Sequence, residues 1–302
     1  MKLRDIYRLA HREYAAYKTR SVATIITVGA LFGLLLGILF VMQGLENVTL
    51  RYAGEATDGW IYLANSYEDR GVDDSFIRQR IERYGGTVVT LSAQQQEQLG
   101  GELPQNIIVA RFQKLKSAND YVNHKDDVRE LGYDAKKYVI EELFSNQLSV
   151  YSYFQDKDHA LIRPVSIVLV IVSAFILAFT MAHLIASNTK TFVLYRSMGA
   201  AKKQLFSIYF MYLMEMCFWA MRFAIILGLL ISGLATGLGW SYLTEQLAQH
   251  YPQTTGHPII LIGLNWRCAE TILCMYLAAP ISFLLCLDQF SNKKIAQKLK
   301  GD

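Results

Sequence analysis

The chain has 302 residues, of which 52% are hydrophobic and only 19% are charged, and its mean hydropathy is +0.20. Soluble domains average about 25% charged and about 45–50% apolar residues, so this composition argues against a disordered chain and against a wholly soluble protein. The length corresponds to about two domains. The net charge of +4 averages over regions of opposite charge and gives no reason to expect a nucleic-acid partner.

Residues 1–21 form the first predicted element, a cytosolic amphipathic helix. Its apolar side chains recur at intervals of three and four residues, which places them on one stripe, and the basic side chains lie off that stripe. We expect this helix to lie along the cytosolic membrane face; the alternative is a basic cluster that only sets the topology. The stripe contains Leu3, Ile6, Tyr7, Ala10, Tyr14 and Tyr17, and the basic residues off it are Lys2, Arg4, Arg8 and Arg12.

Four long apolar segments predict four membrane-spanning helices, because a bilayer core of about 30 Å needs about 20 helical residues. The segments cover residues 22–43, 165–187, 208–240 and 269–287. The first is too long for the apolar core of a signal peptide and no A-x-A-like site follows it, so we interpret it as a retained anchor. Pro280 should kink the fourth.

The distribution of charges predicts the orientation of the chain. Residues 1–21, the loop 188–207 and the tail 288–302 are rich in lysine and arginine, whereas residues 44–163 carry 14 basic and 19 acidic side chains. The positive-inside rule therefore predicts that both termini and the loop 188–207 are cytosolic. Residues 44–163 and a second loop, 241–268, are predicted to be external, in a multi-pass protein of the cytoplasmic membrane.

The external segment 44–163 is long enough for one small domain, and its pattern alternates between strands and helices. We predict strands at 60–64, 87–91 and 106–112, a helix capped by Asp73 or Asp74 and ended by Gly85 and Gly86, and a partly helical stretch at 138–154. This alternation predicts a small α/β or α+β lobe. The expected fold class is a membrane α-helical protein, with four transmembrane helices and this lobe between helices 1 and 2.

Glycines recur in the first and third spans at a spacing that favours close helix packing. Three stand at every fourth position in the first span, and others follow a similar pattern in the third. We expect a helix-packing face, within the chain or in a dimer, although such spacing also arises by chance. The residues are Gly29, Gly33, Gly37, Gly228, Gly233 and Gly237.

Two charged residues, Glu215 and Arg222, lie within the third span. Seven residues correspond to two helical turns, so both side chains lie on one face. Charges at membrane depth are costly and often functional. Two interpretations stay open: a structural role, in which Arg222 snorkels or reaches Glu215 through a polar group or water, and a role in coupling or partner contact.

The sequence carries no positive sign of an enzyme. It lacks the G-x-x-x-x-G-K-[ST] loop, H-E-x-x-H and G-x-S-x-G, and its six histidines show no ligand spacing. The four cysteines lie in or beside the apolar segments, where they act as small apolar fillers. We therefore predict no catalytic, cofactor-binding or metal-binding residues on this chain. The cysteines are Cys217, Cys268, Cys274 and Cys286.

The most informative cytosolic stretch is LYRSMGAAKKQLF, residues 194–206. Its apolar positions share one helical face, and the alternative is a basic loop that only sets the topology. The run RSMGAAKKQL, followed by a glycine-rich span, resembles the R-x-x-G-A-x-[KR]-x-x-[IL] segment of the FtsX-like permease family, which includes MacB-type permeases. The layout of spans and lobe agrees with that family. Thr191 and Tyr212 depart from it, because members often carry acidic residues at these two places.

The resemblance implies a permease subunit of an ABC complex. Such a subunit works as a dimer with a second copy or a homologue, and it binds a cytosolic ATPase subunit that holds the ATP and Mg. ATP-driven movement would pass to the external lobe, and Gly199 would permit a close approach to the ATPase. By position, the ATPase-coupling residues are Arg196, Ser197, Met198, Gly199, Ala200, Lys202 and Lys203.

Three functions remain open at this stage. The first is an ABC permease that exports or extracts a substrate, such as a lipid-linked molecule or a peptide. The second is an FtsX-type signal transducer that controls an external cell-wall hydrolase, since residues 44–163 resemble the lobe of the cell-division FtsX proteins in size. The third is a membrane scaffold with no ATPase. Membrane lipid and an external protein bound to residues 44–163 are the further expected partners.

Overall fold

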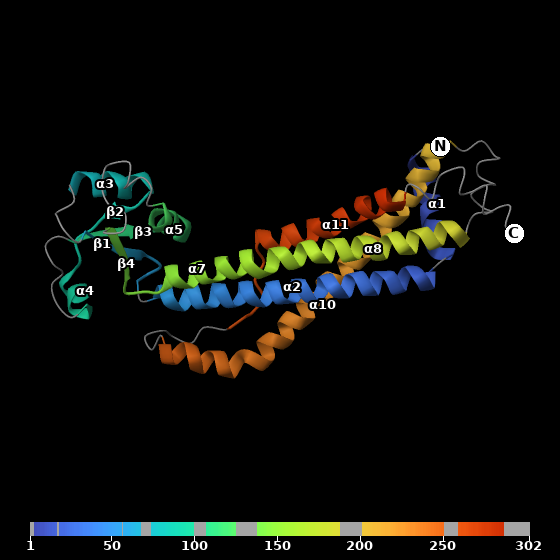
Figure 1. The fold of residues 1–302 in the computed structure, drawn as a ribbon. Helices are drawn as coiled ribbons and strands as arrows, with labels where there is room; N and C mark the ends of the chain where they lie inside the picture. Colours follow the sequence, from blue (N-terminus) through green and yellow to red (C-terminus); the bar gives the residue numbers. More distant parts are fainter. Residues whose placement is uncertain are drawn as a thin grey trace. The chain divides into compact units, whose positions relative to one another are not determined.

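The computed structural model describes residues 3–16, 18–55, 57–67, 74–99, 107–124, 138–187, 201–250 and 259–286 (Figure 1). The chain forms two compact units. One consists of Met1–Gln43, Asp158–Gly237 and Leu261–Asp302, and the other of Gly44–Lys157 and Leu238–Ile260. We call them the helical unit and the sheet unit.

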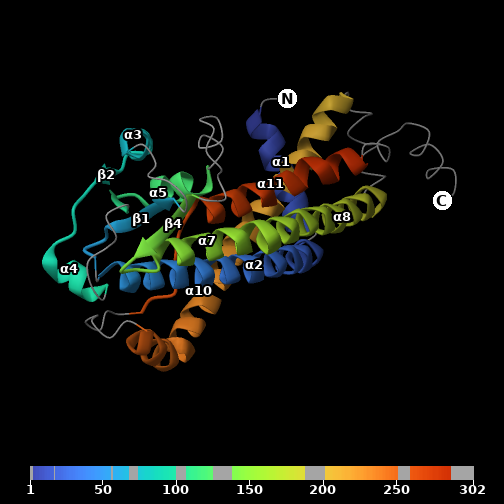
Figure 2. The same cartoon turned by 60° about the vertical axis from the view of Figure 1, so that its left-hand side comes forward.

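Long helices build the helical unit. They are α1 (Leu3–Ala16), α8 (Arg163–Ser187), α11 (Trp266–Cys286) and the greater parts of α2 (Lys18–Glu55) and α10 (Lys202–His250). Residues 44–55 of α2 and 238–250 of α10 belong to the sheet unit. A π-helical turn, η1 (Asp158–Ile162), precedes α8. Helices α8 and α11 pack side by side (Figures 1 and 2). Four described stretches are long and apolar enough to cross a membrane, in agreement with the four predicted spans: Ser21–Glu55, Gln147–Ala186, Lys203–Gln249 and Trp266–Cys286.

The third spanning helix is longer than the sequence predicts. Helix α10 has 49 residues and ends at His250, so residues 241–250, which we expected to begin an outer loop, are helical. At 1.5 Å per residue, this length corresponds to about 70 Å of helix, more than twice the thickness of the bilayer core. Part of α10 must therefore lie outside the hydrocarbon layer.

The helical unit has a protein core and an apolar outer surface. Its core includes Phe32 and Leu36 of α2, Met181 of α8 and Leu213 of α10, all of them almost fully buried. On the outside, Phe179 is 74% exposed, and further apolar side chains of α8 and α10 are exposed as well. An apolar surface of this kind suits contact with lipid rather than with water, as expected of a multi-pass membrane protein.

The sheet unit contains a four-stranded antiparallel sheet in the order β2-β3-β1-β4. Both central strands, β1 and β3, and the short β2 lie at predicted strand positions. The strands are β1 (Ile61–Tyr67), β2 (Thr87–Val88), β3 (Ile108–Phe112) and β4 (Tyr138–Leu143), and the helices are α3 (Asp74–Arg83), α4 (Ala93–Gln98), α5 (Leu115–Asn123) and α7 (Gln147–Lys157).

The stretch 138–154, which we expected to be helical in part, is divided between strand β4 and helix α7. Between them, Phe144 adopts a left-handed backbone conformation with φ 65°. The carboxylate of Glu142 accepts hydrogen bonds from the backbone N–H of Leu148, at 3.0 and 3.1 Å, and from the hydroxyl of Ser145, at 2.9 Å. A carboxylate at this place accepts a hydrogen bond from an otherwise unpaired N–H and interacts favourably with the positive end of the helix dipole. Both effects favour a helix start at this point in the sequence.

A buried polar cluster joins the sheet to its helices. The hydroxyls of Tyr121 and Tyr138 donate to Oδ1 of Asn65 at 2.6 and 2.8 Å. The guanidinium of Arg80 lies 4.1 Å from the Tyr121 ring centroid and donates to the backbone carbonyls of Tyr121 and His124, both at 2.7 Å. Burial raises the pKa of Tyr121 above its usual value, which keeps the hydroxyl neutral and able to donate.

Candidate functional site

Two of the seven predicted coupling residues, Lys202 and Lys203, lie at the start of α10. Arg196, Ser197, Met198, Gly199 and Ala200 lie outside the described residues. Lys202 is the first residue of α10, and Lys203 follows with an exposed side chain. The backbone N–H of Ala201 donates to the side-chain oxygen of Gln204 at 3.1 Å, the reach-back contact of a capping box. In the sequence, the predicted coupling segment therefore extends into the start of α10, the longest of the described helices.

Helix α1 contacts α10 through the predicted intramembrane charge Glu215. His11 Nδ1 lies 2.8 Å from Glu215 Oε1, and the Glu215 side chain is only 8% exposed. The rings of Tyr7 and Tyr14 stack on either side of His11, at centroid distances of 6.2 and 6.3 Å. Burial, followed by the negative charge of Glu215, raises the pKa of Tyr14 above its usual value of 10.0.

A second polar contact joins α10 to the beginning of α2. The hydroxyls of Ser21 and Tyr212 lie 2.8 Å apart, and both side chains are buried. One turn further along α2, the hydroxyl of Thr24 lies 3.0 Å from that of Thr180 in α8. Tyr212, one of the residues at which the sequence departs from the resemblance, therefore has a hydrogen-bonding role of its own.

The other predicted intramembrane charge, Arg222, has aromatic neighbours. Its guanidinium carbon lies 4.4 Å from the ring centroid of Phe218 and 5.1 Å from that of Trp219. Cation–π contacts of this kind attract a guanidinium to the faces of the aromatic rings. The shared helical face thus does not make Glu215 and Arg222 each other's nearest partners, since Glu215 pairs with His11 from a different helix.

The six predicted packing glycines fall into two groups. A Cβ atom added at Gly29 would lie 2.8 Å from the Ala220 carbonyl oxygen, and those added at Gly33 and Gly37 would lie 2.9 Å from side-chain atoms of α10. These glycines therefore stand where α2 and α10 approach most closely. Gly228 faces the same contact from α10, because a Cβ added there would lie 3.2 Å from the backbone nitrogen of Gly37. Nothing lies within 4 Å of a Cβ added at Gly233 or Gly237.

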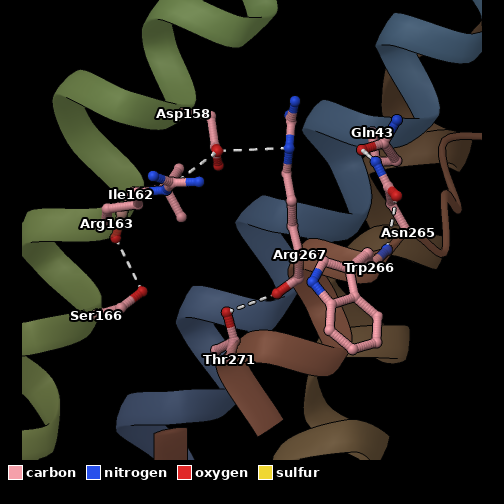
Figure 3. A network of polar contacts seen from close by, with 9 residues as sticks. All are labelled: Gln43, Asp158, Ile162, Arg163, Ser166, Asn265, Trp266, Arg267 and Thr271. Carbon is pink, nitrogen blue, oxygen red and sulfur yellow. Dashed lines mark hydrogen bonds and ion pairs between the residues drawn. The ribbon is translucent and has the colours of Figure 1, made fainter. Parts of the chain in front are cut away.

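A polar network lies where η1 and α8 meet the beginning of α11 (Figure 3). Arg267 Nε is 3.4 Å from Asp158 Oδ2, and Arg163 Nε is 4.0 Å from the same oxygen. The Asp158 side chain is only 5% exposed, so it depends on these arginines for compensation of its charge. Ser166 in turn donates to the Ile162 carbonyl oxygen at 2.8 Å. π-Helical turns are rare and often mark functional places.

An extended strap, residues 259–265, leads into α11 and packs in the helical unit from Leu261 onward. Asn265 donates to the side-chain oxygen of Gln43 at 3.0 Å, as Figure 3 shows, and Gly263 N–H donates to the Phe40 carbonyl at 3.1 Å. Ser232 of α10 donates to the Leu261 carbonyl. Gly263 is required here, because an added Cβ would lie 2.5 Å from the backbone of Gln43. Apart from charges at the ends of apolar runs, no sequence pattern indicated this strap or the Asp158 network.

The described residues offer no metal centre. They contain no group of three or more histidine, cysteine, aspartate or glutamate side chains that could hold a metal ion. The four cysteines are free thiols, and all but Cys274 are buried. The polar clusters at both ends of the helical unit consist of ion pairs and hydrogen bonds between helices, which suits holding the helices in position.

The comparison with known families identifies the C-terminal part of the chain. Residues 165–287 match the FtsX-like permease C-terminal domain, and this stretch begins in α8 and continues past the end of α11. The predicted resemblance to the FtsX-like permease family is thereby confirmed for these residues, which make up less than half of the chain and contain spans two to four. No curated protein matches the chain. The matched model is that of a permease domain.

Proposed function

We propose that this chain is the permease subunit of an ABC complex and converts ATP hydrolysis on a separate ATPase into movement of residues 44–163. The observation that carries the proposal is the family match over residues 165–287, which includes the basic, acid-free stretch 188–207. A basic surface at the cytosolic face complements acidic groups on a partner. The ATPase would hold ATP and Mg, and two permease copies, or a copy and a homologue, would form the dimer.

The described contacts support transmission of movement through the helices. Helix α10 begins at the coupling segment and packs closely on α2 through the glycines at their crossing. A displacement at the start of α10 would therefore pass to α2 through this close contact. Export or extraction of a substrate is the function that we favour for this movement.

The test is purification of the tagged chain from its native membrane. We expect an ATPase with a Walker A loop to co-purify, and Gly199→Asp to release it, because an acidic side chain at a close-approach glycine both fills space and repels acidic groups. Gly301→Asp, in the predicted cytosolic tail, is the matched control and should retain the ATPase. If the unmodified chain brings down no ATPase, the scaffold function replaces the permease function. A wall hydrolase bound to residues 44–163 would favour the signal transducer.

A further inference from the structure

The centre of the α1 stripe packs against protein. We expected this stripe to lie on lipid, but Ile6 is only 9% exposed and Ala10 is fully buried. Both belong to the same apolar cluster as Leu205 and Tyr209 of α10, whereas Tyr7, which lies on the same stripe, is half exposed. Helix α1 is therefore attached to the helical unit along a narrow line.

Two residues of α10 hold the chain on either side of the junction between α1 and α2. Tyr212 and Glu215 are three residues apart and share one helical face. Tyr212 contacts Ser21, at the beginning of α2, and Glu215 contacts His11, in α1, each at 2.8 Å. In the sequence, His11 and Ser21 lie on either side of the boundary between α1 and α2. The direction of α1 relative to α2 is thus set from α10.

Of the two anchor contacts, the one made by Glu215 would be the more unfavourable to break. Oxygen Oε2 of Glu215 is buried and has no hydrogen-bond partner among the described residues, so the contact with His11 at Oε1 compensates this carboxylate. A buried carboxylate without a partner is strongly unfavourable. Separation of His11 from Glu215 is therefore resisted, and α1 stays in register with α10.

We propose that α1 is a second transmission element, which the His11–Glu215 clamp makes move together with α10 when the ATPase displaces the coupling segment. The inference rests on the proposed function. Glu215 lies 13 residues beyond the start of α10 at Lys202, about 20 Å along the helix, so a rigid α10 carries the displacement to the clamp. His11 and Glu215 are positioning residues, because they act through α1 and not on the ATPase or on a substrate.

The first experiment tests the clamp without any ATPase. In native membranes, the double variant His11→Cys with Glu215→Cys should react with a short bifunctional thiol reagent to give an intramolecular cross-link. Arg12→Cys with Glu215→Cys is the matched control and should give little product, because Arg12 is adjacent in sequence, exposed and turned away by about 100° of helix. Equal yields from the two pairs would overturn the clamp.

The second experiment tests transmission, by the ATP hydrolysis of the co-purifying ATPase in reconstituted membranes. We expect Glu215→Ala to keep the ATPase bound but to reduce stimulation of hydrolysis by about tenfold, the factor that corresponds to losing a hydrogen bond to a charged group. The exchanged pair, His11→Glu with Glu215→His, should restore stimulation to within about twofold. Arg12→Ala should leave it unchanged.

The cross-linked protein gives the sharpest result. If α1 moves together with α10, locking residues 11 and 215 together leaves stimulation intact, whereas releasing them reduces it. Loss of stimulation on cross-linking would show that α1 must move relative to α10. Unchanged stimulation in Glu215→Ala would show that α1 transmits no movement. Either result overturns the inference while the proposed function stands. If no ATPase co-purifies with the unmodified chain, the proposed function fails and the transmission role fails with it, but the cross-link yield still decides the clamp.

Discussion

The crossing of α2 and α10 provides a direct test of the glycine contacts, with Gly29→Ala as the perturbation. A Cβ at this position would lie 2.8 Å from the Ala220 carbonyl oxygen and 2.8 Å from Cδ1 of Phe223. A side chain can rotate away, but the backbone carbonyl can withdraw only if the helices separate. Overpacking of this kind costs about 1–3 kcal/mol. Gly233→Ala is the control, because nothing lies within 4 Å of its added Cβ.

The comparison of the two variants isolates the clash. Alanine favours a helix over glycine by about 1 kcal/mol at either position, so this contribution cancels in the difference between them. We therefore expect Gly29→Ala to be less stable than Gly233→Ala by about 1–3 kcal/mol, measured as the free energy of unfolding in mixed-micelle SDS titrations. Equal stabilities would refute the close α2–α10 contact and place the first-span glycines on a surface that nothing occupies.

Three further predictions concern buried polar groups. Arg80→Leu should destabilise the sheet unit by about 2–4 kcal/mol, because a buried and a partly buried carbonyl lose their guanidinium donor, whereas Arg80→Lys should cost less. Thermal unfolding, monitored by protease resistance, measures both variants, and equal losses would contradict the two-carbonyl contact. Asp158→Asn should lower the unfolding free energy of the helical unit by about 1–3 kcal/mol through loss of the pair with Arg267, and an unchanged midpoint in SDS titration would argue against that pair. Burial raises the pKa of Glu142 above 4.5. The protonated Glu142 side chain therefore contributes stability that is fully present below pH 4.5 and is lost as the pH rises through the folded-state pKa. Glu142→Gln should make thermal stability less dependent on pH in that window, and an unaltered pH profile would contradict the raised pKa of Glu142.

The sequence predicts those parts of the fold that depend on local pattern. The spans follow from runs of uncharged residues, and the strands β1 and β3 follow from short apolar runs between polar turns, because both signals lie within a few neighbouring residues. The stretch 138–154 shows the limit of this approach. Val139 and Ile140 favour a strand, but the change to helix depends on the left-handed turn at Phe144 and on the contacts of Glu142.

The candidate site depends on contacts between residues far apart in the chain, and so most of it could not be predicted. His11 and Glu215 are separated by 204 positions, and no local pattern indicates that they meet. The seven-residue spacing of Glu215 and Arg222 correctly gives a shared face, but it says nothing of a third helix that supplies a closer partner. The strap at 259–265 could not be predicted for the same reason, because the residues that hold it, Phe40, Gln43 and Ser232, are distant in the sequence.

The most direct test of the proposed mechanism is the side of the membrane on which residues 44–163 lie. Glu97 is exposed in α4, and Arg8 is exposed in α1, so single cysteines at these positions can be labelled with a membrane-impermeant maleimide in intact cells. We predict that Glu97→Cys reacts in intact cells and that Arg8→Cys reacts only after the membrane is permeabilised. Labelling of both positions under the same condition would place the sheet unit and the amino terminus in one compartment and contradict transmission across the membrane.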